Sequence, residues 1–320
     1  MAQRISLAAV RDAARHIYAV AARTPLVPLD LGPEAPRIYL KLETLQPIGS
    51  FKIRGAFNAV RQLTPEQRAE GVWTVSAGNA AQGVALAARA LGARCSVMVI
   101  DTAPRTKVGA IERLGAQIVT ATYEECWRTV EQHGSDRMQG VFVHPFDDDR
   151  FIAGNGTLAL EIVEDLPEVD AVVAAVGGGG LVGGIGSALA ELKPGAKVYA
   201  AEPVTAAPLH GSLAQGRASA FPGWQASFVD GAGGRSVLPG MWPLLREVVA
   251  ASIVVSLEEV ADAMRTVAER ARVIAEGAAG CAVAAALTGR AGRGPLVAVV
   301  SGGNIDLSRF ALVVGACRST

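Results

Sequence analysis

The chain has 320 residues, which is enough for a large hydrophobic core and two lobes. Basic and acidic side chains each number 30, so the formal net charge is zero, which argues against binding to nucleic acid or to an anionic membrane surface. Charged residues or glycine interrupt every hydrophobic run before the ~18 residues that a membrane span needs.

In chain order, short apolar runs alternate with longer helical stretches. Residues 1–20 form an amphipathic pattern without the apolar core of a signal peptide. The runs predict strands at 37–43, 71–77, 95–100, 117–121, 140–146, 170–180 and 197–203, with a strand and loop at 294–306. The longer stretches predict helices at 55–63, 80–92, 104–115, 124–134, 150–166, 181–192 and 256–276.

This alternation is typical of an α/β protein with open parallel sheets and helices on both faces. Residues 71–145 form a self-contained set of strand–helix repeats. We therefore expect a small lobe at 71–145, inserted in a large lobe made of 1–70 and 146–320. Three unusual loops, "SAGN", "VGGGG" and "VVSGGN", follow predicted strands. Ligands of such sheets bind at the carboxyl ends of strands, so these loops are candidate binding segments.

Glycine is in excess, at 36 residues, and it clusters in the segment "VVAAVGGGGLVGGIG" at 172–186. Four consecutive glycines before a helix allow backbone amides to approach a phosphate, which the helix N-terminus also attracts. A tight turn is the plainer explanation. A dinucleotide site is a further alternative, because Gly178, Gly180 and Gly183 match G-x-G-x-x-G and Glu202 ends the next strand.

The other two loops carry polar side chains. In "SAGNAAQG" (76–83), Asn79 either caps a helix or contacts a ligand, and the amides of 77–80 suit a carboxylate. In "VVSGGNID" (299–306), the strand ends at Ser301, whose hydroxyl either closes a turn or meets a ligand heteroatom.

A lysine completes the set. Lys52 lies between Phe51 and Ile53, just after a turn, so its amine is either solvated at the end of a packed stem or used as a nucleophile. A phosphate cradle, a carboxylate nest, an amide, a hydroxyl and a lysine together suit one cofactor, pyridoxal 5'-phosphate.

These segments resemble those of the fold-type II pyridoxal-phosphate enzymes, specifically the serine/threonine dehydratase and serine racemase family, whose fold is similar to the tryptophan synthase β subunit. The resemblance rests on "KLETLQPIGSFKIRGA", "SAGNAAQG", "GGGGL" and "SGGN", in this order. It implies that Lys52 binds the cofactor covalently as the catalytic residue. It also implies cofactor contacts from Phe51, Asn79, Gly177, Gly178, Gly179, Gly180, Leu181, Glu276 and Ser301, and substrate contacts from Ser76, Ala77, Gly78, Asn79 and Ala80.

The family likeness implies a dehydratase that converts a β-hydroxy-α-amino acid to a 2-oxo acid and ammonia. Racemases of the group have a second serine where this chain has Ala77, which favours the dehydratase. A racemase or another β-eliminating lyase of the same family is the alternative. Ala80 replaces a common histidine, which leaves room for a substrate bulkier than threonine or serine, such as 3-phenylserine.

Other expectations are negative or general. We expect no metal, because Glu202 is retained but Pro208 stands where an aspartate ligand would complete the site. The histidines, His16, His133, His144 and His210, are interpreted as structural or surface residues, and 147–149 as a helix N-terminus. The cysteines, Cys95, Cys126, Cys281 and Cys317, lack metal spacing and indicate reduced thiols in a cytoplasmic protein. The resemblance suggests a homodimer without a C-terminal regulatory domain.

Overall fold

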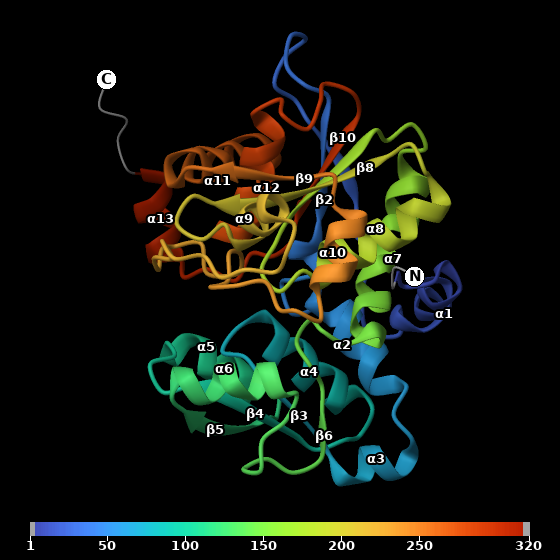
Figure 1. Cartoon of the computed structure of the whole chain (residues 1–320), viewed down its shortest axis with the longest axis vertical. Coiled ribbons are helices and arrows are strands. Elements are labelled where there is room, and N and C mark those ends of the chain that lie inside the picture. Colours follow the sequence, from blue (N-terminus) through green and yellow to red (C-terminus); the bar gives the residue numbers. More distant parts are fainter. Residues whose placement is uncertain (1–3, 316–320) are drawn as a thin grey trace.

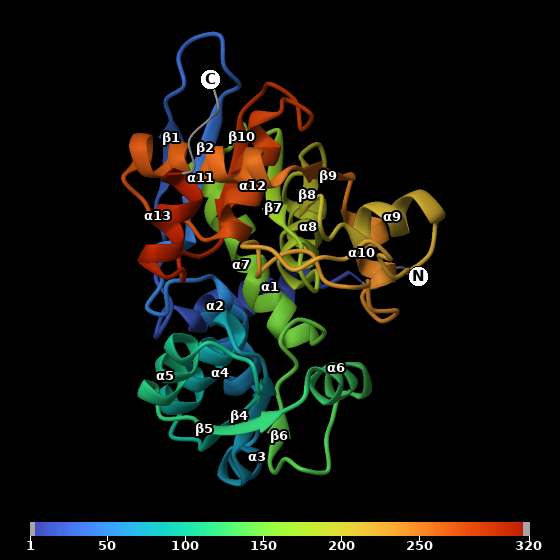
Figure 2. The ribbon, with the colours of Figure 1, turned by 90° about the vertical axis from the view of Figure 1, so that its left-hand side faces the viewer.

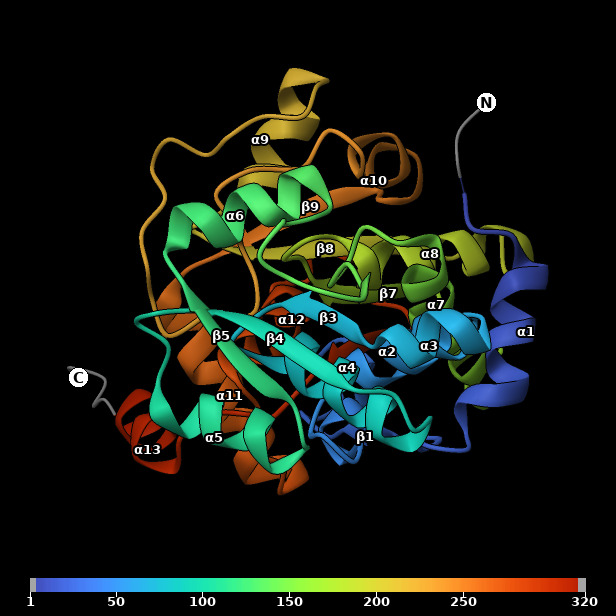
Figure 3. The same ribbon diagram turned by 90° about the horizontal axis from the view of Figure 1, so that it is seen from below.

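The computed structural model describes residues 4–315 and arranges them around two β-sheets, one in each of two lobes (Figure 1). The chain leaves the larger sheet after strand β2 (Ile38–Leu42), builds the smaller sheet, and returns at β7 (Ala171–Ala175). The smaller lobe is thus inserted in the larger one, as expected. Figure 2 shows the two lobes one above the other, and Figure 3, seen from below, has the smaller lobe in front.

The larger sheet has six strands in the order β1-β2-β10-β7-β8-β9. Its two central strands, β7 and β10, are short, uniformly apolar runs, as is typical of parallel strands covered on both faces. The edge strand β1 was not predicted and pairs antiparallel with β2, so the sheet is not parallel throughout. Exposed Pro28 within β1 fits an edge, because proline cannot donate to a further strand. The remaining bounds are β1 (Leu26–Leu29), β8 (Lys197–Pro203), β9 (Ala251–Val255) and β10 (Leu296–Val300).

The smaller sheet is parallel and has the order β5-β4-β3-β6. Its strands are β3 (Val72–Val75), β4 (Cys95–Ile100), β5 (Gln117–Ala121) and β6 (Val141–Phe142). The proposed division at 71–145 assigns this sheet to the smaller lobe. Helices α2 (Lys52–Arg61) and α3 (Pro65–Glu70) precede that boundary, yet α2 packs on α4 (Asn79–Ala90) of the smaller lobe as well as on α7 (Asp149–Asp165).

Alternate residues of the larger sheet point into two separate cores. Val172 and Ala174 of β7 pack with α7 and α8 on one face, whereas Ala171 and Val173 pack with α11 and α12 on the other. The sheet is therefore a middle layer covered on both sides (Figure 1). The helices not yet given are α1 (Leu7–Ile17), η1 (Glu43–Leu45), α5 (Arg105–Arg113), α6 (Tyr123–Gln132), α8 (Gly180–Leu192), α9 (Pro208–Gln215), α10 (Trp242–Val248), α11 (Leu257–Ala271), α12 (Gly277–Leu287) and α13 (Leu307–Gly315).

Most predicted elements are present, and several are shorter than predicted; the strand predicted at 170–180, for example, is Ala171–Ala175. The strand predicted at 140–146 is reduced to Val141–Phe142, and the helix predicted at 256–276 ends at Ala271 because Arg272 has a left-handed conformation. Helix α12 was missed: it is built from alanine and glycine with buried positions all round, so it has no amphipathic period. Elements β1, α3, α9, α10, β9 and α13 were also not predicted.

The other general expectations concern the cysteines and the membrane. Cys95, Cys126 and Cys281 are buried and free, whereas Cys317 lies outside the described residues. No helix within residues 4–315 is long and apolar enough to cross a bilayer.

Candidate active site

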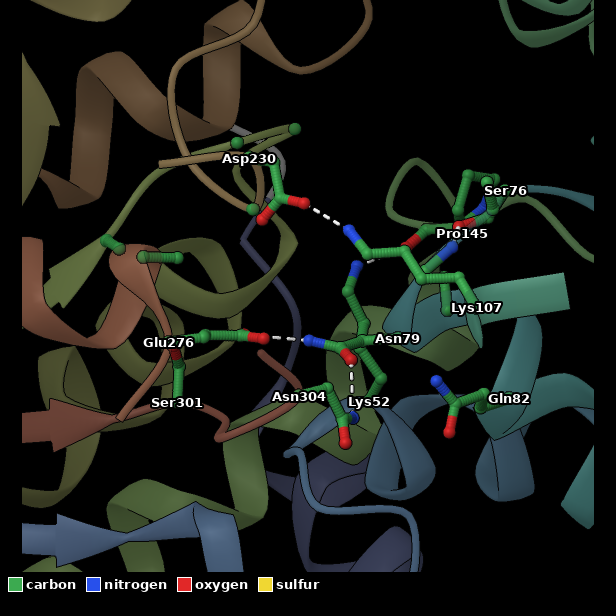
Figure 4. Close-up of a pocket in the computed structure, with 18 of the residues that line it drawn as sticks. Lys52, Ser76, Asn79, Gln82, Lys107, Pro145, Asp230, Glu276, Ser301 and Asn304 are labelled. Carbon is green, nitrogen blue, oxygen red and sulfur yellow. Dashed lines mark hydrogen bonds and ion pairs between the residues drawn. The ribbon is translucent and has the colours of Figure 1, made fainter. Parts of the chain in front are cut away.

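A cavity of about 510 Å³ lies between the two lobes, at the carboxyl ends of strands β3, β7 and β10. Every site residue implied by the family resemblance lines it: Phe51, Lys52, Ser76, Ala77, Gly78, Asn79, Ala80, Gly177, Gly178, Gly179, Gly180, Leu181, Glu276 and Ser301. Figure 4 shows Lys52, Asn79, Glu276, Ser301 and Asn304 gathered around this space. Segments that are distant in the sequence therefore meet in one site.

Lys52 is the first residue of α2 and is partly buried, with its Nζ donating to the carbonyl oxygen of Pro145 at 2.7 Å. The Nζ lies 5.3 Å from the centroid of the Phe51 ring and 5.4 Å from that of Phe151. Burial lowers the pKa of this amine to about 8, although the nearby Glu276 opposes the shift. The amine thus loses its proton more easily than an exposed lysine, as a nucleophile requires.

Two sets of contacts fix the Lys52 segment. On one side, the Phe51 amide donates to the Ser301 carbonyl at 3.0 Å, and Ser50 pairs with Gly302. On the other, fully buried Arg54 makes paired hydrogen bonds to Glu43 and to Glu161. These contacts tie α2 to the larger lobe, so the lysine stands on a rigid support.

The glycine loop runs from the end of β7 into α8. Gly179 has φ +93°, and a Cβ on Gly178 would lie 2.1 Å from Cγ of Phe146, so larger residues are excluded at both positions. No acceptor in the described part of the chain is bonded to the amides of 177–181. Free amides at the start of a helix form an anion site, so the loop fits the phosphate of the expected cofactor.

The asparagine loop follows β3 in the same manner. Gly78 is the N-cap of α4, and its amide donates to Oγ of Ser76 at 3.0 Å. The amides of Ala77, Asn79 and Ala80 have no acceptor within residues 4–315. These amides are free to bind a carboxylate at the helix N-terminus.

The Asn79 side chain does not cap helix α4, so the alternative in which this residue serves only as a helix cap is wrong. Its Nδ2 donates to Oε1 of Glu276 at 2.8 Å, and its Oδ1 accepts from Nδ2 of Asn304 at 2.7 Å. One Nδ2 hydrogen remains available for a ligand oxygen in the cavity. Burial, together with nearby Asp230, raises the pKa of Glu276 to about 7, and the bond from Asn79 partly offsets this rise.

Ser301 directly follows strand β10 and is 4% exposed. Its side chain lines the cavity, and its hydroxyl has no hydrogen-bond partner among the described residues. The hydroxyl is therefore available to pair with a ligand atom in the cavity. The donors and the amine together fit pyridoxal 5'-phosphate.

Among the lining residues without a predicted role, three polar residues make contacts across the site. Asn304 holds Asn79, and it stood unassigned inside the quoted "SGGN" segment. Lys107 of α5 and Asp230 form an ion pair between the lobes at the cavity (Figure 4). Their separation of more than a hundred residues carries no sequence signal, because only the folded chain brings them together.

None of the four histidines lines the cavity, and His144 forms hydrogen bonds to the backbone. It accepts at Nδ1 from the amides of Phe146 and Asp147, while its Nε2 contacts the carbonyl oxygen of Val130. Burial lowers its pKa to about 3, so it stays neutral. His133, His144 and Asp147 lie close enough for a metal, but both ring nitrogens of His144 are already engaged. Within 147–149, Asp148 is the N-cap of α7, as the acidic run predicted.

Glu202 is fully buried and bonded to protein groups, the amides of Leu209 and His210 and the hydroxyl of Ser252. Gly183 packs against Leu244. The carboxylate is therefore engaged by the protein and cannot bind a ribose as the dinucleotide alternative requires.

Comparisons with known proteins agree with this geometry. The model of the family described as pyridoxal-phosphate dependent enzymes matches residues 17–302. The L-threonine ammonia-lyase of Thermotoga maritima is 39% identical over 319 residues, which are 97% of this chain and 78% of that protein. The serine racemase of Bos taurus is 36% identical over 285 residues, 86% of this chain and 85% of that protein. The solved structure of maize serine racemase has a TM-score of 0.85 and 30% identity, covering 97% of both chains.

Proposed function

Because the chain belongs to the pyridoxal-phosphate dependent enzyme family and pyridoxal 5'-phosphate is its cofactor, we propose that it is a dehydratase, an ammonia-lyase acting on β-hydroxy-α-amino acids. The proposed reaction removes the α-proton and the β-hydroxyl of the substrate as water, and hydrolysis of the resulting unsaturated amine gives a 2-oxo acid and ammonia. The observation that carries it is the Lys52 amine, with its lowered pKa, placed in one cavity with two sets of free amides.

The residues divide between cofactor and substrate. We assign the amides of 177–181 to the cofactor phosphate, Asn79 to the ring oxygen, Ser301 to the ring nitrogen and Lys52 to the aldehyde carbon. When bound, the cofactor supplies an electron-withdrawing ring that acidifies the α-carbon of an attached amino acid. The amides of Ala77, Asn79 and Ala80 hold the substrate carboxylate.

The protein's own acid–base group is Lys52. A neutral amine at Nζ accepts the α-proton of the bound substrate, and its pKa of about 8 keeps a useful fraction unprotonated near neutral pH. Ser301 donates a weak, neutral hydrogen bond, unlike a carboxylate, which would keep the ring nitrogen protonated. With the cofactor bound, a neutral hydroxyl at this position would favour elimination of the β-hydroxyl over reprotonation of the α-carbon.

Ala77 favours elimination over racemisation. Racemisation by two bases needs a proton donor on the face opposite Lys52, and a methyl group cannot supply one. The other side chain of this loop that carries a hydroxyl is Ser76, and its Oγ accepts a hydrogen bond from the amide of Gly78. Racemase activity is therefore the less favoured alternative, although serine racemases are among the relatives.

A substrate panel tests the proposal. Purified enzyme is incubated with L-threonine, L-serine and 3-phenylserine, and the ammonia and 2-oxo acid are assayed, with Lys52→Ala as the inactive control. Equal yields of both products are expected from at least one substrate. Conversion of L-substrate to its D-enantiomer without ammonia, measured by chiral chromatography, would favour the racemase instead.

We also propose that the enzyme is a cytoplasmic homodimer. Three buried free cysteines suit a reducing compartment, and likeness to the family supports a dimer. Sedimentation velocity of the purified protein would test the dimer, since a monomer at micromolar concentration would contradict it.

A further inference from the structure

A second cavity, of about 170 Å³, opens beside the glycine loop, and we call it the annexe. It lies between α6 of the smaller lobe and the segment 230–238 of the larger lobe. Phe146, Gly177, Gly178, Asp230 and Gly231 line both this space and the cofactor cavity. The annexe therefore opens directly from the cavity that we assign to the cofactor and the substrate.

The walls of the annexe are apolar and aromatic. Trp127 and Phe146 supply rings, and Val237, Leu238 and Leu245 supply aliphatic side chains. Trp127 donates its Nε1 proton to Glu131 on its own helix.

Charge is nearly absent from this space. Asp230 is the one charged residue of its described lining, and it is already paired with Lys107. The neighbouring Arg235 stacks between the rings of Tyr123 and Trp224 and does not line the annexe. An anionic or strongly polar substituent would find no spare cation here.

The size of the annexe indicates what it holds. An apolar protein cavity of roughly 150 Å³ accepts benzene, and the annexe measures about 170 Å³. Threonine, with a methyl group on its β-carbon, would leave most of that space unfilled. Serine has no carbon there at all.

We propose that the annexe binds the β-substituent of the substrate, and that the substrate class is a β-hydroxy-α-amino acid with an aryl group, of which 3-phenylserine is the simplest. This rests on the proposed dehydratase function. With the carboxylate at the start of α4 and the phosphate in the glycine loop, the annexe is the apolar space that continues from the cavity. The sequence had placed extra room at Ala80, which lines the cofactor cavity but not the annexe.

Steady-state kinetics of the holoenzyme test the proposal. The kcat/KM for L-threo-3-phenylserine should exceed that for L-threonine at least ~10-fold, as an apolar pocket discriminates by that factor per well-placed carbon group. Trp127→Ala should lower the value for phenylserine by ~10-fold or more and change the value for threonine far less. Arg128→Ala, an exposed neighbour on the same helix, is the matched control and should change neither.

A binding measurement guards against loss of folding. L-phenylalanine, which has no β-hydroxyl to eliminate, should raise the thermal unfolding midpoint of the holoenzyme more than L-alanine does. Trp127→Phe, the milder variant, should keep part of this difference and Trp127→Ala should lose it. Absorbance of the bound cofactor and circular dichroism confirm that each variant is folded.

The outcomes separate the two proposals. If threonine or serine is used as well as phenylserine, or if Trp127→Ala lowers all substrates equally, the annexe proposal is overturned while the dehydratase stands. If folded, cofactor-loaded enzyme releases no ammonia from any of the three substrates, the proposed function itself is wrong.

Discussion

Replacing Gly178 by alanine should weaken cofactor binding through a steric clash that can be read directly from the structure. The new Cβ would lie 2.1, 2.2 and 2.4 Å from three atoms of the Phe146 ring. Carbon atoms in contact lie about 3.5–4.0 Å apart, so the ring or the loop must move by more than ~1 Å. His144 stands edge-on to the Phe146 ring, at 4.6 Å between centroids, and limits the ring's movement.

Overpacking of this kind costs about 1–3 kcal/mol. If the loop takes up the strain, the dissociation constant for pyridoxal 5'-phosphate rises by about 5- to 150-fold, since each 1.4 kcal/mol is a factor of ten. Titration of the apo-protein with the cofactor, followed by absorbance, measures this constant. Gly109→Ala is the matched control: it lies in α5, meets only the end of Arg113 at 3.5 Å, and should bind the cofactor normally.

A double variant isolates the clash. Combining Gly178→Ala with Phe146→Ala removes the ring that the new methyl group meets, so the loss should be smaller than the sum of the two single losses. Unchanged cofactor affinity in Gly178→Ala, with wild-type thermal stability, would refute the view that this loop holds the phosphate.

The other predictions concern charge and the reaction face. The pKa of the Glu276 carboxyl is raised from 4.5 to about 7, so between pH 4.5 and pH 7 the folded apo-protein binds a proton that the unfolded chain does not. The free energy of unfolding should therefore fall as the pH rises from 4.5 to 7. Glu276→Gln should flatten this pH dependence in urea-unfolding measurements, and an unchanged dependence would count against the assignment. Arg54→Met leaves Glu43 buried without a cation and removes one of the two cations that pair with Glu161, so it should lower the unfolding free energy by about 3–5 kcal/mol. Arg61→Met, at a partly exposed pair on the same helix, should lower it by less than about 1 kcal/mol. If both variants lowered the unfolding free energy equally, the buried ion pairs of Arg54 would not be what anchors α2. On the proposed assignment, Ala77→Ser would supply the proton donor that two-base racemisation needs opposite Lys52, so some D-enantiomer should appear in chiral chromatography. Its complete absence would count against the proposed reason why elimination is favoured.

The binding loops were predictable because their chemistry is local. A glycine run before a helix, an asparagine after a strand and a serine at a strand end each imply a conformation within a few residues. Their convergence followed from the fold class, since parallel strands present their carboxyl ends at one edge. The structure confirms that convergence, because Lys52, Asn79, Gly178 and Ser301 all line one cavity.

What could not be predicted depends on distant parts of the chain. The annexe needs Trp127 of the smaller lobe opposite Val237 of the larger one, and neither residue marks a site alone. The buried Arg54 cluster joins residues from three separate elements and looks in sequence like ordinary surface charge. Helix α12 was missed because burial on all sides removes the period by which a helix is found.

The most direct test of the account is to reduce the holoenzyme with borohydride and map the labelled peptide by mass spectrometry. The cofactor should be attached to Lys52 and to no other lysine. Two nearby lysines serve as internal controls, because Lys41 is fully buried in an ion pair with Glu161 and Lys107 is paired with Asp230. A label on either of these, or no label in protein that still turns over substrate, would contradict the assignment on which the proposed mechanism depends.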